Sequence, residues 1–178
     1  MSTIRRPSPS LPDSVFATFS MRDKVAIITG GAGGIGYQVA RGLAEAGANI
    51  ALWYNTSSQA EQLAATIAKD FGVTAKAYQC DVQDFNKVQC ARDAVLSDFG
   101  RLDVMIANAG IPSKGGGLDD RIEDWNRVVD VDFSGAYYCA RAAGEVFRQQ
   151  GSGSLIFTSS MSGHAVNVPQ QQVSSRIS

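Results

Sequence analysis

The stretch KVAIITGGAGGIG, from Lys24 to Gly36, decides the fold. It begins with a short apolar run, Val25 to Thr29, and its glycines lead directly into a helical apolar pattern. A glycine-rich turn between a strand and a helix lets backbone N–H groups approach a phosphate, and the helix N-terminus adds partial positive charge. Glycine also serves ordinary turns and close packing, so the strand-to-helix context supports the prediction more than the glycines alone.

Within this turn each glycine has an expected task. Gly30 makes the bend, Gly34 admits the pyrophosphate of a dinucleotide, and Gly36 allows the helix to contact the strand. Ile35 begins the helix beside the same phosphate site. The turn therefore predicts a dinucleotide-binding site.

Strand and helix patterns alternate outward from this stretch. We expect strands at Val25 to Thr29, Asn49 to Trp53, Thr74 to Gln79, Leu102 to Ala107 and Ser154 to Thr158. We expect helices at Ile35 to Ala46, at Ser57 to Phe71 and at Glu123 to Gln149, and a further helix that Asp84 caps and that reaches Phe99 and Gly100. Short right-handed crossovers make such strands parallel, with helices on both faces. The fold class is α/β, a doubly wound parallel sheet (Rossmann fold), incomplete at about five strands.

In such sheets ligands bind at the carboxyl ends of the strands, beside the first strand. Residues at the ends of three later strands together outline one crevice. They are Cys80, Asp81 and Val82 after the third strand, Asn108, Ala109 and Gly110 after the fourth, and Ser159 and Ser160 after the fifth. Taken singly, each could be a turn residue or a residue flanking a helix, but as a set at successive strand ends they indicate a site.

The end of the second strand bears on the choice of cofactor. A fold that binds NAD usually places Asp or Glu there, about 20 residues after the glycines. Here residues 52–56 read LWYNT, without a carboxylate to repel a 2′-phosphate. Asn55, Thr56 and Ser57 can hydrogen-bond that phosphate, although no Arg or Lys stands beside them. The sequence favours NADP(H) over NAD(H) and leaves NAD(H) open.

Composition narrows the function classes. The 178 residues contain 16 Lys and Arg against 17 Asp and Glu without a basic run, which argues against nucleic acid as a partner. Cys80, Cys90 and Cys139 read as buried free thiols of a reducing compartment, and His164 is too isolated for a metal site. No apolar run reaches the roughly 18 residues of a membrane span. We therefore expect a cytoplasmic protein that has neither a membrane span nor a metal site.

Five segments together resemble the short-chain dehydrogenase/reductase family, from about Met21 to Gln172. They are TGGAGGIG (29–36), CDV (80–82), ANAG (107–110), VDFSG (131–135) and FTSSMSG (157–163). Segments such as WYNTSSQAE, YYCARAAG and SGHAVNVPQQQ resemble the fungal NADPH-dependent branch of sorbose reductase, L-xylulose reductase and mannitol dehydrogenase.

The resemblance implies hydride transfer between a nicotinamide and a small sugar, polyol or ketone, in full-length relatives that are homo-oligomers. It implies that Asp81 and Val82 hold the adenine, that residues 108–110 line the adenosine and ribose, and that Ser160 hydrogen-bonds the substrate carbonyl. The candidate cofactor-binding residues are Gly30, Gly34, Ile35, Gly36, Asn55, Asp81, Val82, Asn108, Ala109 and Gly110, and the candidate catalytic residues are Ser160 and Asp132.

Two departures from the family pattern affect catalysis. Asp132 stands where the family usually has an asparagine, which leaves a proton-relay role open. The Tyr-x-x-x-Lys pair expected 13 to 15 residues after Ser160 is absent, since no tyrosine follows Tyr138 and no lysine follows Lys114. Without that tyrosine the loss from general acid catalysis is roughly 10²- to 10⁴-fold.

These departures give the expected domain organisation. We expect a flexible N-terminal arm at residues 1–20, a truncated NADP-binding Rossmann domain at 21–172, and a tail at 173–178 that does not resemble the family. Translation through an unspliced intron is one hypothesis for the tail. The sequence thus predicts an oxidoreductase with impaired catalysis, and leaves open a nucleotide-binding module without turnover or a non-functional product.

Overall fold

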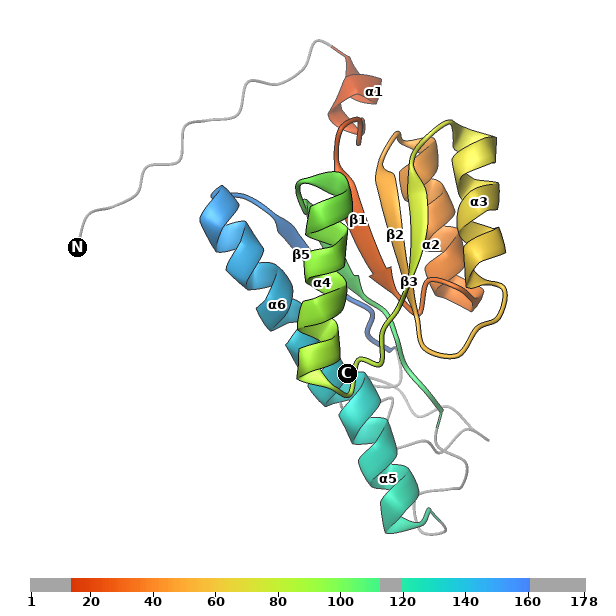
Figure 1. The fold of residues 1–178 in the computed structure, drawn as a ribbon, viewed down its shortest axis with the longest axis vertical. Helices are drawn as coiled ribbons and strands as arrows, with labels where there is room; N and C mark the ends of the chain where they lie inside the picture. Colours follow the sequence, from red (N-terminus) through yellow and green to blue (C-terminus); the bar gives the residue numbers. More distant parts are fainter. Residues whose placement is uncertain (1–13, 113–119, 161–178) are drawn as a thin grey trace, which may run out of the picture.

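The computed structural model describes residues 14–112 and 120–160, and the predicted tail at 173–178 lies outside them. A single parallel sheet forms the centre, in the strand order β3-β2-β1-β4-β5 (Figure 1). The strands are β1 (Val25–Thr29), β2 (Asn49–Tyr54), β3 (Ala75–Gln79), β4 (Val104–Ala107) and β5 (Ser154–Phe157). The order changes direction beside β1, so the predicted crevice falls between β1 and β4.

Helices cover both faces of the sheet, which confirms the doubly wound α/β prediction (Figure 1). Helices α2 (Gly34–Glu45) and α3 (Ala60–Phe71) pack on one face, and α4 (Phe85–Phe99) and α6 (Gly135–Gln150) on the other. β1 lies in the middle and is buried at every position, because both of its faces are covered. Its side chains alternate between the two cores: Ala26 and Ile28 face α2, whereas Val25 and Ile27 face α4 and α6.

The predicted helix from Glu123 to Gln149 is not continuous. It consists of α5 (Ile122–Val128), a π-helical segment η1 (Val129–Ser134) and α6. Apolar periodicity over one turn does not separate a π-helix from an α-helix, so the pattern gave no sign of η1. The expected apolar flank is also only partly buried, since Phe133 and Tyr137 are more than half exposed.

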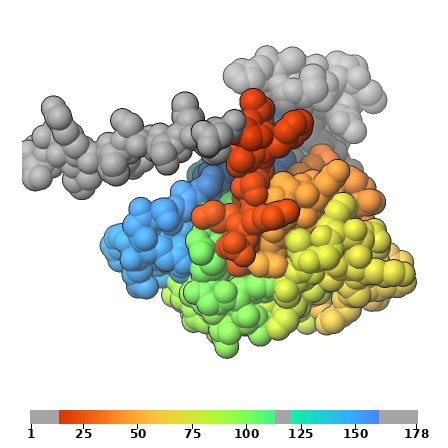
Figure 2. All heavy atoms as spheres, turned by 90° about the horizontal axis from the view of Figure 1, so that it is seen from above, coloured from red at the N-terminus to blue at the C-terminus, as the bar shows by residue number. Residues whose placement is uncertain are grey.

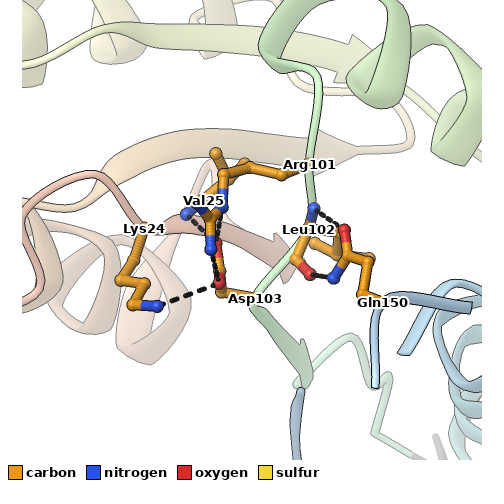
Figure 3. Close-up of polar contacts among 6 residues, drawn as sticks. All are labelled: Lys24, Val25, Arg101, Leu102, Asp103 and Gln150. Atoms are coloured by element: carbon orange, nitrogen blue, oxygen red, sulfur yellow. Dashed lines mark hydrogen bonds and ion pairs between the residues drawn. The ribbon is translucent and has the colours of Figure 1, made fainter. Parts of the chain in front are cut away.

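Opposite the crevice, a buried carboxylate ties the beginnings of β1 and β4 together (Figure 3). Asp103 accepts hydrogen bonds from the Val25 N–H at 3.0 Å and from the Arg101 guanidinium at 2.6 and 2.7 Å, and Lys24 lies 3.3 Å away. Burial alone would raise the pKa of Asp103, but the Arg101, Val25 and Lys24 donors hold it below its usual range. The cluster is structural and lies far from the strand ends that define the crevice.

The described part of the predicted N-terminal arm includes a short helix, α1 (Val15–Thr18), while residues 1–13 lie outside the described residues. Figure 2 looks onto the end of the molecule where the strands begin, and this N-terminal segment (red) stands out from it. The prediction of three buried thiols was partly wrong: Cys80 and Cys139 are buried, but Cys90 on α4 is exposed. Cys90 falls on the outer side of an amphipathic helix, which a single cysteine in a sequence does not reveal.

Candidate functional site

A pocket of about 170 Å³ lies at the carboxyl ends of the strands, beside β1. Six of the ten predicted cofactor-binding residues line it. They are Gly30, Asn55, Asp81, Val82, Ala109 and Gly110. A larger hollow of about 700 Å³ lies between α1 and the ends of α2 and α3, and none of the predicted site residues lines it. The smaller pocket is therefore the candidate site.

The glycine-rich turn begins under strict steric limits. Gly30 has a φ of +64°, and a Cβ there would lie 3.1 Å from the Cα of Ala109. A Cβ on Gly36 would lie 2.5 Å from the carbonyl oxygen of Gly30. Any side chain at these two positions would separate α2 from β1 and from the loop after β4.

The same turn is open further along. Gly34 has a φ of +48°, and a Cβ at Gly34 or at Gly33 would meet no atom within 4 Å. Gly34 is the first residue of α2, so the space lies over a helix N-terminus whose backbone N–H groups attract anions. Ile35 is 69% exposed beside it, so its side chain takes no part in the core. These features fit a pyrophosphate held by backbone donors.

Asp81 and Asn55 both line the pocket, and each already accepts hydrogen bonds from within the chain. The Asp81 Oδ1 accepts hydrogen bonds from the backbone N–H of Gln83 at 3.2 Å and from its side-chain amide at 3.1 Å. The backbone carbonyl of Asn55 accepts a hydrogen bond from the Gln79 amide at 2.9 Å. The first two contacts stay within the loop after β3, and the third joins the loop after β2 to the end of β3, while Val82 beside Asp81 is buried.

Thr29, at the end of β1, holds the next strand end in place. Its Oγ1 accepts hydrogen bonds from the N–H groups of Asn108 and Ala109 at 2.9 and 2.8 Å. The Asn108 amide donates to the Thr29 carbonyl at 3.0 Å, and its oxygen accepts from the Thr158 hydroxyl at 3.2 Å. From the sequence, Thr29 was expected only as the last residue of the first strand and the first residue of TGGAGGIG. Its position directly before the glycines was the available signal, but its partners lie about 80 residues away.

Asp132 lies on the π-helical segment η1, against the loop that follows β4. Its Oδ1 accepts a hydrogen bond from the N–H of Ile111 at 2.9 Å, and a Cβ on Gly110 would lie 3.4 Å from the same oxygen. Burial raises the pKa of Asp132, and the Ile111 N–H partly opposes that shift. Asp132 therefore positions the loop of Ala109 to Ile111, at the rim of the pocket.

Ser160 follows β5 by three residues and is partly exposed. β5 pairs in parallel with β4, so this serine comes to the same edge of the sheet as Asn108 and Gly110. The segment 161–178, where the family pattern has its Tyr-x-x-x-Lys pair, lies outside the described residues.

Within residues 14–112 and 120–160, no group of three or more His, Cys, Asp or Glu side chains is arranged to hold a metal ion. None of the helices in that part of the chain is long and apolar enough to cross a membrane.

The comparisons with known proteins agree with this geometry. The family model for short chain dehydrogenase matches residues 24–174. The chain is 45% identical over 174 residues to the probable NADP-dependent mannitol dehydrogenase of Yarrowia lipolytica, covering 97% of this chain and 62% of that relative. It is 46% identical over 167 residues to a sorbose reductase of Candida albicans, covering 93% of this chain and 59% of that relative.

A solved structure is similar over nearly the whole chain. The NADPH-dependent 3-quinuclidinone reductase from Rhodotorula rubra superimposes with a TM-score of 0.90 at 42% identity, covering 99% of this chain and 66% of that structure. The chain thus spans about 60% of the length of the curated relatives that it matches.

Proposed function

This chain belongs to the short chain dehydrogenase family, and from that premise we propose that it binds NADP(H) and that the protein it represents interconverts a ketose and its polyol. Relatives whose names describe such reactions support this proposal. They include the mannitol dehydrogenase of Yarrowia lipolytica, the sorbose reductase of Candida albicans and an L-xylulose reductase of Hypocrea jecorina. All three cysteines are free, which fits a reducing compartment such as the cytoplasm.

One observation supports nucleotide binding most strongly. The glycine turn and the ends of β2, β3 and β4 meet around one pocket at the switch point of the sheet. The same glycine turn leads into α2, and the space over the N-terminus of that helix is open. This arrangement offers a base pocket and a phosphate cradle that begin at the same glycine turn, as a dinucleotide requires.

We assign the following roles to the residues. Gly34 and the first N–H groups of α2 hold the pyrophosphate, Asp81 and Val82 hold the adenine, and Asn55 faces the 2′-phosphate end of the ribose. Neutral donors suit that end because the stretch after β2 has no carboxylate. Bound NADPH would supply the hydride. Ser160 would hydrogen-bond the substrate oxygen, and Asp132 would keep the loop of Gly110 in place.

A second candidate function is nucleotide binding without turnover by these 178 residues. The sequence observation behind it is the absence of a tyrosine after Tyr138 and of a lysine after Lys114. A substrate oxygen would then lack a positioned proton donor, and we expect ketose reduction by this chain alone to be undetectable.

Titration with NADPH and NADH tests the proposal, with nicotinamide fluorescence as the readout. We expect NADPH to bind at least tenfold more tightly than NADH, and Gly36→Ala to lose the binding. A folded chain that binds neither nucleotide would refute the proposal. Ketose-dependent oxidation of NADPH, measured on the same sample, separates the two functions: turnover near normal enzyme rates would exclude the second one.

A further inference from the structure

Trp53 on β2 has an unusual environment for its polar atom. It is the largest fully buried side chain, with a relative exposure of 0%. Its indole Nε1 is buried and has no hydrogen-bond partner among the described residues. An unsatisfied buried N–H destabilises the molecule that contains it, so such groups in native proteins are rare and need an explanation.

Trp53 lines the candidate pocket, together with Cys80, Asp81 and Val82. Its neighbours in the core are apolar or weakly polar, and none of the described ones accepts its proton. Several polar groups around the pocket already have partners in the chain: Asp81 with Gln83, and Asn55 with Gln79. Trp53 is thus a residue of the pocket lining whose indole N–H is a buried donor without a partner.

The dimensions and chemistry of the pocket indicate which part of a ligand enters it. At about 170 Å³ it is smaller than the roughly 300–1,000 Å³ of a complete small-molecule site, so it accommodates one ring system. The Trp53 indole offers only a donor, whereas a carboxylate such as that of Asp81 offers acceptors. Adenine offers the matching pair, because its ring nitrogens are acceptors and its exocyclic amine is a donor.

We propose that the Trp53 Nε1–H donates a hydrogen bond to a ring nitrogen of the adenine of NADP(H), so that this indole helps to select the adenosine half of the cofactor. The inference rests on the proposed function. Because Nε1 is enclosed, the acceptor reaches it only after the indole or a side chain that covers it moves. Binding of adenosine therefore changes the surroundings of Trp53.

Two variants and one probe test the inference. The probe is adenosine 2′,5′-bisphosphate, which carries the adenosine half without the nicotinamide. The chain has two tryptophans, so Trp125→Phe leaves Trp53 as the only indole emitter. In Trp125→Phe we expect the probe to shift or quench the indole emission. This measurement leaves Trp53 itself unsubstituted. A Trp53→Phe chain keeps an aromatic ring but lacks the donor, and we expect it to bind the probe about 5- to 30-fold more weakly.

The control is Trp125→Phe, on α5, which should bind the probe like the unsubstituted chain. Unchanged emission of Trp53 at saturation would overturn the inference, as would equal affinity of a folded Trp53→Phe chain. In both of these results the unsubstituted chain still binds NADPH, so the proposed function stands. If the unsubstituted chain binds neither NADPH nor the probe, the proposed function and the inference fail together.

Discussion

At the scale of single residues, Thr29 shows how one buried hydroxyl organises the crevice. It is 1% exposed, accepts two hydrogen bonds from the loop after β4, and donates to the Ile106 carbonyl at 3.4 Å. A valine of similar shape would leave the N–H groups of Asn108 and Ala109 unsatisfied. We therefore expect Thr29→Val to lower the free energy of unfolding by about 1–3 kcal/mol, measured by urea denaturation.

Thr66→Val provides the matched control for Thr29→Val. Thr66 lies on the exposed face of α3, and its hydroxyl donates to the Gln62 carbonyl one turn earlier. Water can replace this hydrogen bond, so we expect a change within about 0.5 kcal/mol. If both variants unfolded at the same urea concentration, the Thr29 hydroxyl would have no special part in joining β1 to β4.

The carboxyl group of Asp132 should make stability depend on pH in a defined direction. Its pKa is raised by burial in the folded chain, so folding favours the protonated form. Its contribution to stability is present below the unfolded pKa of about 3.9 and is lost as pH rises through the folded pKa. Asparagine stays neutral and still accepts a hydrogen bond from the Ile111 N–H. We expect Asp132→Asn to be more stable than the parent at pH 7.

Urea denaturation between pH 4 and pH 8 measures this effect. The advantage of Asp132→Asn should shrink as the pH falls toward 4. Asp130→Asn is the control, because it removes an exposed carboxylate from the same π-helical segment. A stability difference that stays constant over this range, or that has the opposite sign, would contradict the assignment of the raised pKa to Asp132.

At the scale of elements, two glycines of α2 have opposite effects that follow from their surroundings. A Cβ on Gly36 would collide with the Gly30 carbonyl, whereas a Cβ on the exposed Gly42 would meet nothing within 4 Å. Gly36→Ala should lower the free energy of unfolding by about 1–3 kcal/mol. Gly42→Ala should raise it by about 0.5–1 kcal/mol, because alanine favours a helix interior.

Thermal unfolding of both variants, with NADPH titration of each, checks the comparison. Gly42→Ala should keep the nucleotide affinity of the parent, since it lies far along α2 from the turn. A Gly36→Ala chain as stable as the parent, with full affinity, would mean that α2 and β1 do not need the close contact that the structure shows.

Some features of the helices and strands could be predicted from the sequence, and others could not. β1 was predicted at its observed bounds, and the Asp84 cap of α4 was predicted and is present, because both depend on local signals. The interruption at η1 was not predicted. Residues in it and just after it meet distant parts of the chain: Asp132 accepts from the Ile111 N–H, and a Cβ on Gly135 would lie 2.7 Å from Val82. The hydrogen bonds of Thr29 and the unpartnered Nε1 of Trp53 were missed as well. Their partners, or the lack of them, are set by tertiary packing.

At the scale of the whole molecule, the two edges of the sheet differ in their protection. The edge strand β3 has the sequence AKAYQ, and Lys76 on it pairs with Asp98 at 2.9 Å. Charged side chains discourage a second strand from pairing with an edge. The opposite edge strand, β5, has the sequence SLIF and no charge, and Leu155, Ile156 and Phe157 are 38%, 45% and 52% exposed.

This asymmetry predicts that the 178-residue chain associates with itself through β5. Parallel strands are usually buried on both faces, so the exposed apolar side chains of β5 favour contact with another apolar surface. Light scattering after size exclusion, over a tenfold range of concentration, should show a mass that rises with concentration. Phe157→Lys should return the mass toward that of the monomer. Ile122→Lys is the control, because Ile122 is 69% exposed on α5 and away from the sheet. An unsubstituted chain that stays monomeric throughout, or an equal effect of both substitutions, would show that β5 is not the surface responsible.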